Sequence, residues 1–106
     1  VICRKQKSNQ MKSLPQLDPL LHNTLRLAIM SILVSVKEAD FSYLQDATSS
    51  SNGNLSVQIT KLKDAEYINV KKTFVNNYPK TTCSISKKGI KAFEDYVRNL
   101  KFYITK

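Results

Sequence analysis

Side chains suited to reading nucleic-acid bases are concentrated between residues 54 and 61. The amides of asparagine and glutamine can form paired hydrogen bonds with adenine, lysine can donate to guanine, and valine can contact the thymine methyl group. When a helix enters the major groove of DNA, its N-terminal part usually meets the bases. We therefore predict base contacts from Asn54, Ser56, Val57, Gln58 and Lys61.

The apolar residues of the same segment predict the helix that would hold these side chains. Leu55, Ile59 and Leu62 recur at intervals of four and three, which places them on one face of a helix and leaves polar residues on the other. A helix face that is merely solvated would show the same pattern. Periodicity alone therefore leaves base reading and simple solvation as open interpretations.

A lysine-bearing β-hairpin is predicted directly after this helix. β-Branched and aromatic residues are frequent in 67–70, 73–75 and 80–86, as in strands. The sequence Asn-Asn-Tyr-Pro at 76–79 is typical of a turn. Lysines here suit phosphate contacts, although lysines on exposed strands also prevent aggregation. The hairpin residues that we predict to contact DNA are Lys71, Lys72, Asn77, Tyr78 and Lys80.

The residues just before the base-reading helix can also contact the DNA backbone. Ser51 and Asn52 stand at the expected helix N-terminus, where amide groups and the helix dipole attract phosphate. Ordinary capping of the helix explains the same residue types equally well. Both interpretations can hold at once.

Positive charge is concentrated on the predicted helix and hairpin. The chain has 17 basic and 8 acidic residues, which give a formal net charge of +9. Residues 55–88 alone carry seven lysines against Asp64 and Glu66. A basic balance by itself would also suit an anionic membrane or an acidic protein. Its concentration on these two elements favours nucleic acid as the partner.

Residue sets that support other functions are missing from the sequence. His22 is the single histidine, and Cys3 and Cys83 stand alone, so we expect no metal site. With two glycines and no nucleophile–base pair, we expect neither a phosphate-binding loop nor an enzyme, and no cofactor. The longest apolar run, 28–36, is too short to span a bilayer. We therefore expect a cytoplasmic protein with no membrane partner. Two reduced thiols suit that compartment, and a single long-range disulfide between Cys3 and Cys83 is the alternative.

The N-terminal part of the chain predicts an arm followed by a helix. Residues 1–16 are basic and lack apolar periodicity, which favours a loosely ordered arm, and residues 17–106 form one domain. Asp18 and Pro19 suit the cap and the first position of a helix. The apolar face of that helix runs to Val36.

A short helix at 41–47, capped by Asp40, and a last helix at about 87–104, capped by Ser86, complete the predicted elements. The last helix carries apolar residues close to a heptad spacing, which suits packing against a second copy of the chain. Folding back onto its own core is the alternative. The predicted homodimer contacts are Leu21, Leu25, Phe93, Tyr96, Val97, Leu100, Tyr103 and Ile104.

Four phrases of the sequence resemble the small stand-alone winged-helix regulators of bacteria and archaea that are related to the MarR and ArsR groups. They are LDPLLHNTLRLAIMSIL (17–33), DFSYLQ (40–45), NGNLSVQITKLKDAEYI (52–68) and TTCSISKKGIKAFEDY (81–96). The resemblance implies an α+β fold, a winged helix-turn-helix with a three-helix core, a β-hairpin wing and an additional C-terminal helix. The chain departs from the family phrases at Glu66, where relatives usually have glycine, and at Gln58, where they often have histidine.

The resemblance also implies a function. Such relatives bind double-stranded DNA as two-fold dimers, with the wing along the backbone or in the minor groove. For this chain it implies a sequence-specific transcriptional regulator, a repressor acting as a homodimer. Thr81 matches a family phrase, which implies a phosphate contact or a bond to the opposing strand. Arg26 stands where relatives use arginine to support the fold or to reach the backbone, and pairing with an acid such as Asp46 is the alternative.

Other functions remain open at this point. A winged helix can serve as a protein–protein module, in which case the lysines would meet an acidic partner. RNA or single-strand binding has less support, because no aromatic residues alternate with the basic ones on a sheet face. An unknown small-molecule effector, bound between the first and last helices, is a further open question.

Overall fold

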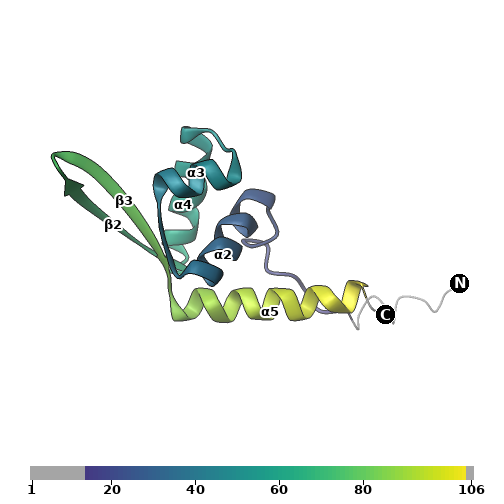
Figure 1. The fold of residues 1–106 in the computed structure, drawn as a ribbon. Coiled ribbons are helices and arrows are strands. Elements are labelled where there is room, and N and C mark those ends of the chain that lie inside the picture. Colours follow the sequence, from purple (N-terminus) through teal and green to yellow (C-terminus); the bar gives the residue numbers. More distant parts are fainter. Residues whose placement is uncertain (1–13, 105–106) are drawn as a thin grey trace, which may run out of the picture.

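Helices form one side of the molecule, and a β-hairpin projects away from them (Figure 1). A computed structural model describes residues 14–104, so most of the predicted arm lies outside the described residues. The elements, in chain order, are α2 (Thr24–Val36), β1 (Glu38–Asp40), α3 (Phe41–Thr48), α4 (Asn52–Asp64), β2 (Ile68–Val75), β3 (Tyr78–Ile85) and α5 (Lys87–Ile104). The helices α2, α3 and α4 gather beside α5, the long C-terminal helix (Figure 1). The predicted α+β winged-helix fold is confirmed.

The core lies where α2, α3 and α4 meet the base of the sheet. Its fully buried side chains are Leu21, Ile29, Met30, Leu33, Leu44, Leu55, Leu62, Ile68 and Cys83. The predicted apolar back of the base-reading helix is confirmed, because Leu55, Ile59 and Leu62 of α4 are all buried. Each such leucine contributes about 1.5–3 kcal/mol through removal of its surface from water. Burial also raises the pKa of the Cys83 thiol to about 11.

The first helix begins later than the sequence predicted. The Asp18 carboxylate does cap a turn, since it accepts a hydrogen bond from the Leu20 amide at 2.9 Å. That turn ends at Asn23, whose extended backbone (φ −150°) interrupts the helix and whose side chain caps a new one. Helix α2 therefore starts at Thr24, because Asn23 is a second strong capping residue downstream of the first.

The hairpin is longer and tighter than predicted. The two short predicted strands are one continuous strand, β2, and the second strand begins at Tyr78 rather than at residue 80. The turn consists of Asn76 and Asn77, both with left-handed backbone (φ 52° and 68°). A two-residue turn of this kind matches the natural twist of the strands. Its register brings Val75 opposite Tyr78.

A third strand, β1, was not predicted. It pairs with β3 in antiparallel fashion, so the strand order is β1-β3-β2. It comprises three residues, Glu38, Ala39 and Asp40, and this is too short for a periodic pattern. Asp40 then caps α3 as predicted, accepting from the Tyr43 amide at 2.8 Å.

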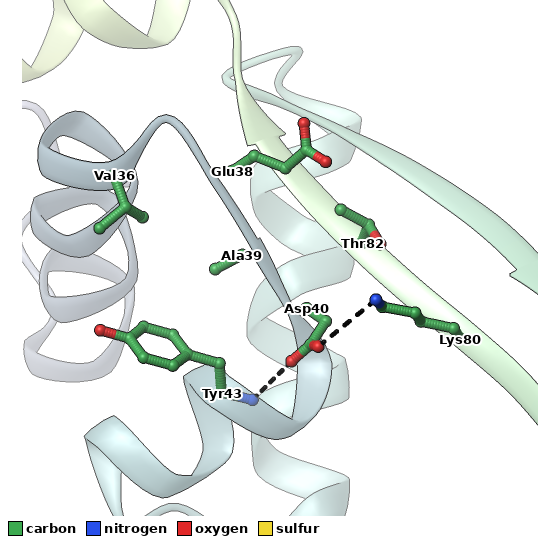
Figure 2. A pocket seen from close by; sticks show the side chains of 7 residues that line it. All are labelled: Val36, Glu38, Ala39, Asp40, Tyr43, Lys80 and Thr82. Atoms are coloured by element: carbon green, nitrogen blue, oxygen red, sulfur yellow. Dashed lines mark hydrogen bonds and ion pairs between the residues drawn. The ribbon is translucent and has the colours of Figure 1, made fainter. Parts of the chain in front are cut away.

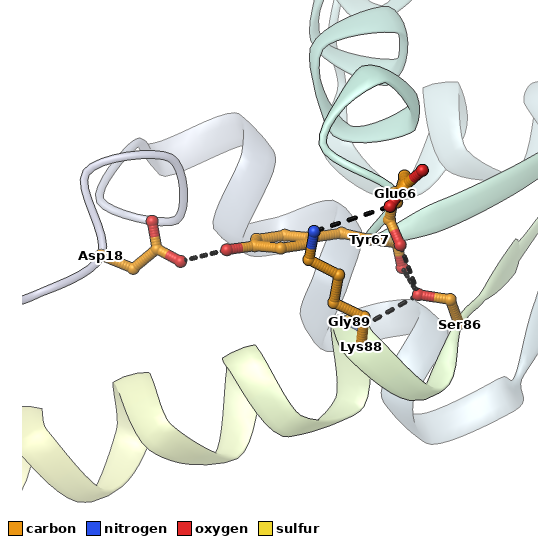
Figure 3. A network of polar contacts seen from close by, with 6 residues as sticks. All are labelled: Asp18, Glu66, Tyr67, Ser86, Lys88 and Gly89. Atoms are coloured by element: carbon orange, nitrogen blue, oxygen red, sulfur yellow. Dashed lines mark hydrogen bonds and ion pairs between the residues drawn. The ribbon is translucent and has the colours of Figure 1, made fainter.

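A polar joint fixes the base of the hairpin against α5 (Figure 3). The Ser86 hydroxyl accepts from the Gly89 amide, as expected of a helix cap, and also donates to the Tyr67 carbonyl. A Cβ atom at position 89 would lie 2.1 Å from that carbonyl oxygen, so only glycine fits there. The Tyr67 hydroxyl donates to Asp18, and desolvation together with this bond raises the pKa of Tyr67 to about 12.

The tight turn between α4 and β2 forms although it lacks the glycine of the relatives. Glu66 adopts left-handed backbone there, with φ of 67°. A residue with a side chain is strained in this region, by about 1 kcal/mol or more. The Ser86 hydroxyl lies 2.7 Å from the Glu66 carbonyl oxygen and helps to hold this conformation.

Candidate nucleic-acid interface

The outer face of α4 presents most of the predicted base-reading residues to solvent. Asn54, Ser56, Val57 and Lys61 are exposed, and Val57 keeps half of its surface (50%) although it is apolar. Their exposure follows from the burial of the leucine face on the other side of the same helix. This face is therefore free to enter a groove.

Gln58 is held in place by hydrogen bonds on both sides. The Arg26 guanidinium donates to its side-chain carbonyl, and its own amide nitrogen donates to the Asn54 side chain at 3.1 Å. Arg26 also donates through Nε to the Leu20 carbonyl, at 2.6 Å. Arg26 thus supports the reading helix from α2, rather than pairing with Asp46. It orders two of the predicted base-reading side chains before any DNA is bound.

A cleft joins α4 to the hairpin. Its lining residues come from α3, α4, β2 and β3, and they are Phe41, Ser56, Ile59, Thr60, Lys63, Val70, Lys72 and Thr81. A polar flank of α4, formed by Ser56, Thr60 and Lys63, therefore faces the Lys72 side of the hairpin, whereas the other predicted base-reading residues do not line this cleft. Two lysines and no carboxylate are found among these lining residues, so the cleft suits an anionic partner.

The structure adds two polar residues to this surface that were not among the predicted contacts. Thr60 and Lys63 line the cleft beside Ser56. Ser56, Thr60 and Lys63 are spaced by four and three residues, which places them on one helix face. That spacing is visible in the sequence, although Thr60 and Lys63 lie beyond the N-terminal half of the helix, which usually meets the bases.

The hairpin lysines do not all share one face. Side chains alternate along a strand, and Lys72 lies opposite Thr81, on the α4 side, whereas Lys71 lies opposite Thr82. Lys80 belongs to the same face as Lys71, and it lies 3.9 Å from the Asp40 carboxylate. All three lysines are exposed.

The far face of the sheet differs in charge from the α4 side. Figure 2 shows the hollow on that face, where Lys80 and Thr82 stand beside β1 and α3. Its lining includes the carboxylates Glu38 and Asp40 as well as Lys80. Exposed ion pairs such as Lys80–Asp40 stabilise a fold by at most about 1 kcal/mol. Their presence nevertheless makes this face less attractive to phosphate than the cleft.

The N-terminus of α4 combines capping with access to solvent. Ser51 caps the helix, accepting from the Asn54 amide at 3.2 Å, so the capping interpretation of Ser51 is confirmed. Asn52 is exposed, and it lines a hollow together with Asp40 and with Pro79, Lys80 and Thr81 of β3. The start of the reading helix therefore also faces the hairpin. Asn77 and Tyr78 stand at the hairpin tip and are exposed.

The predicted dimer residues fall into two groups. Leu21 (0% exposed) and Tyr96 (4%) fill the core of the chain itself, and the Tyr96 hydroxyl lies 2.9 Å from His22 Nδ1. Partial exposure remains at Leu25, Phe93, Val97 and Leu100, and Tyr103 and Ile104 are exposed. Leu21 and Tyr96 thus have no surface left for a partner, because the last helix folds back onto α2 at those positions.

Within residues 14–104, no group of three or more His, Cys, Asp or Glu residues could hold a metal ion. In the same part of the chain, no helix is both long enough and apolar enough to cross a membrane. Among the described cysteines, Cys83 is buried and free, and Cys3 lies outside the described residues.

Comparisons with known proteins point in the same direction. A family model described as a winged helix DNA-binding domain matches residues 25–104. An uncharacterized protein of Methanocaldococcus jannaschii is 27% identical over 78 residues, which are 74% of this chain and 85% of that protein. The solved structure of a transcriptional regulator homologue from Pyrococcus horikoshii OT3 is similar with a TM-score of 0.75 and 27% identity, over 95% of each chain.

A more distant structure shares the fold. NadR, solved in complex with 4-hydroxyphenylacetate, has a TM-score of 0.67 and 16% identity, over 94% of this chain and 71% of that one. The resemblance to winged-helix transcriptional regulators that the sequence phrases indicated is confirmed.

Proposed function

The chain belongs to the winged helix DNA-binding domain family, and on that premise we propose that it is a sequence-specific transcriptional regulator that binds duplex DNA as a homodimer. The family is a DNA-binding class and not an enzyme class. One observation carries the proposal: a polar flank of α4, formed by Ser56, Thr60 and Lys63 beside the exposed base-reading face, lines a cleft without a carboxylate together with the Lys72 face of the hairpin.

Base reading is assigned to the exposed face of α4. A B-DNA major groove, about 12 Å wide, admits one helix. Asn54, Gln58 and Lys61 then face base edges, Val57 suits a thymine methyl group, and Ser56 lies beside them. Arg26 acts through Gln58, because its hydrogen bond fixes the orientation of that amide.

Phosphate contacts are assigned to the residues around this helix. Lys72 and Thr81 lie in the cleft, and Ser51 and Asn52 lie at the start of α4. Lys71, Lys80, Asn77 and Tyr78 extend the contact along the hairpin. Such contacts position the protein and make its affinity depend on salt.

The homodimer is assigned to the end of α5 and to the adjacent face of α2. Val97, Leu100 and Ile104 keep apolar surface there, together with Leu25. Two copies related by a two-fold axis would read two half-sites one DNA turn apart, about 34 Å. We propose repression as the mode of action, since occupying an operator requires no surface beyond the DNA-binding face.

An effector site is proposed beside the same helices. A hollow between the start of α2 and α5 is lined by His22, Asn23, Thr24, Leu27 and Tyr96. The NadR structure holds 4-hydroxyphenylacetate, so a protein of this fold can bind a small molecule. For this chain, an effector in the hollow would meet both helices assigned to the dimer.

Selection of bound duplexes from a random pool at near-physiological salt tests the proposed function. We expect the recovered sequences to share a pseudo-palindrome. Lys61→Ala should weaken binding to a recovered duplex and relax its preference over other sequences, whereas Lys91→Ala, an exposed lysine of α5, should not. Recovery of no duplex, together with capture of an acidic protein by the same lysines, would favour a protein-docking module instead.

A further inference from the structure

The tip of the β2–β3 hairpin is apolar on both faces and fully displayed to solvent. Phe74 is 77% exposed and Tyr78 is 75% exposed. Phe74 lies opposite Pro79, and Val75 lies opposite Tyr78, so each face carries one apolar cross-strand pair. A cluster of adjacent exposed apolar residues differs from scattered single ones, and it marks a contact surface.

The tip is also stiff. Pairing runs without a break from Ile68 opposite Ile85 to Val75 opposite Tyr78. Because Val75 and Tyr78 flank a two-residue turn, the next pair, Phe74 and Pro79, is of the kind that exchanges no backbone hydrogen bonds. The ring of Pro79 therefore costs no bond in the ladder, and it blocks pairing with a further strand. Directly behind the polar Asn76–Asn77 turn, the hairpin thus carries a continuously paired apolar segment.

The length of the hairpin suits one particular place on DNA. From Val70, which lines the cleft, the strand continues six residues to the turn at Asn76, or about 20 Å at about 3.4 Å per residue. One turn of B-DNA measures about 34 Å, so the minor groove beside an occupied major groove is about 17 Å away. With α4 in the major groove, the tip reaches the neighbouring minor groove.

Charge along the hairpin fits this placement. Lys71, Lys72 and Lys80 stand behind the tip and not at it. Phosphates line the walls of the minor groove, and the bases form its floor. The lysines are therefore placed for the walls, and the apolar tip for the floor.

We propose that the tip enters the minor groove and that Phe74, backed by Pro79, wedges between stacked base pairs and bends the duplex. The proposal rests on the proposed function, since it requires α4 in the adjacent major groove. Apolar side chains that wedge into a base step kink DNA by about 20–90°. Flexible pyrimidine–purine steps open most easily. The wedge should therefore favour such steps without forming hydrogen bonds to their base edges.

The test uses duplexes recovered with the wild-type protein from a random pool. 2-Aminopurine is placed in turn at each step flanking the recovered half-sites, and a donor–acceptor pair on the duplex ends reports bending. Wild type is compared with Phe74→Ala and with the control Tyr43→Ala, an exposed tyrosine (51%) of α3 that lines the hollow on the far face of the sheet. Circular dichroism verifies that both variants remain folded, as expected for exposed side chains.

We expect a rise of 2-aminopurine fluorescence at one flanking step and a shortened end-to-end distance with wild type and with Tyr43→Ala. Phe74→Ala should lose both signals, yet weaken binding by about tenfold or less. The free energy gained by inserting the ring is largely spent on unstacking the base step, so its loss changes the affinity little. Binding that depends on Lys61 but shows neither signal would overturn the wedge and leave the proposed function standing. Failure to recover any duplex would overturn both.

Discussion

Helix α4 and the hairpin line one cleft, but they are held in place in different ways. Helix α4 has a fully buried back, and Arg26 ties its polar front to α2. The hairpin has buried residues only at its base, namely Ile68 and Cys83, and beyond them it depends on cross-strand pairing. A substitution on the buried back of α4 should therefore alter folding as well as binding, whereas one in the outer hairpin should alter binding alone.

Leu55→Ala should produce the largest effect, because it removes a fully buried side chain from the back of α4. We expect a loss of about 2–5 kcal/mol in the free energy of unfolding. Val75→Ala, in the outer hairpin, should change it by about 0.5 kcal/mol or less. Urea denaturation followed by circular dichroism measures both. Equal losses for the two variants would erase the distinction between the regions.

Arg26→Ala should affect stability and specificity together. It leaves the partly buried Gln58 carbonyl and the Leu20 carbonyl without their donor, which should cost about 1–3 kcal/mol of stability. Without this hydrogen bond the Gln58 side chain is no longer held in one orientation. Binding to the recovered duplex should therefore weaken more than binding to random duplexes. Arg26→Lys serves as the control that retains charge, and it should restore stability only in part, because lysine lacks the planar fork. An unchanged specificity ratio would assign Arg26 to folding alone.

Lys72→Ala and Lys71→Ala separate the two faces of the hairpin. Lys72 lines the cleft beside α4, and Lys71 lies on the opposite face. Each phosphate contact that is lost should lower the salt slope of binding by about one. We expect the full change for Lys72→Ala and a smaller one for Lys71→Ala, as measured by fluorescence anisotropy over a salt series. The reverse order would place the duplex on the far face of the sheet.

The smallest effect concerns the turn between α4 and β2, which connects the reading helix to the hairpin. Glu66 has left-handed backbone, so Glu66→Gly should raise stability, by about 0.5–1 kcal/mol, after the greater freedom of glycine in the unfolded chain is counted. The exposed ion pair with Lys88, at 3.7 Å, offsets little of this gain. Thermal unfolding measures the change, and Glu66→Ala is the control because alanine keeps the backbone strain. A destabilised Glu66→Gly variant would show that the side chain holds the turn.

Local patterns in the sequence predicted the parts of the fold that local forces determine. The burial of Leu55, Ile59 and Leu62 followed from their spacing, and the start of α5 followed from Ser86. The start of α2 was predicted wrongly because Asp18 and Asn23 both cap turns, and the sequence does not rank them.

Contacts between distant residues were beyond the reach of pattern analysis. The bond between Arg26 and Gln58 spans 32 positions, and β1 exists only because β3 passes beside it. The burial of Leu21 and Tyr96 likewise depends on how the helices of one chain pack. The residue types of the candidate surface were therefore predictable from the sequence, whereas the hydrogen bonds and packing that hold these residues in place were not.

The most direct test of the central claim is an NMR titration of the ¹⁵N-labelled protein with a recovered duplex. If the polar face of α4 and the cleft side of the hairpin meet one DNA molecule, the amide signals from Asn52 to Lys63 and around Lys72 and Thr81 should shift together, in proportion to the DNA added. Signals of Glu38 and of the hollow beside β1 should change least. Shifts centred on β1 and Glu38, with α4 unaffected, would contradict the account.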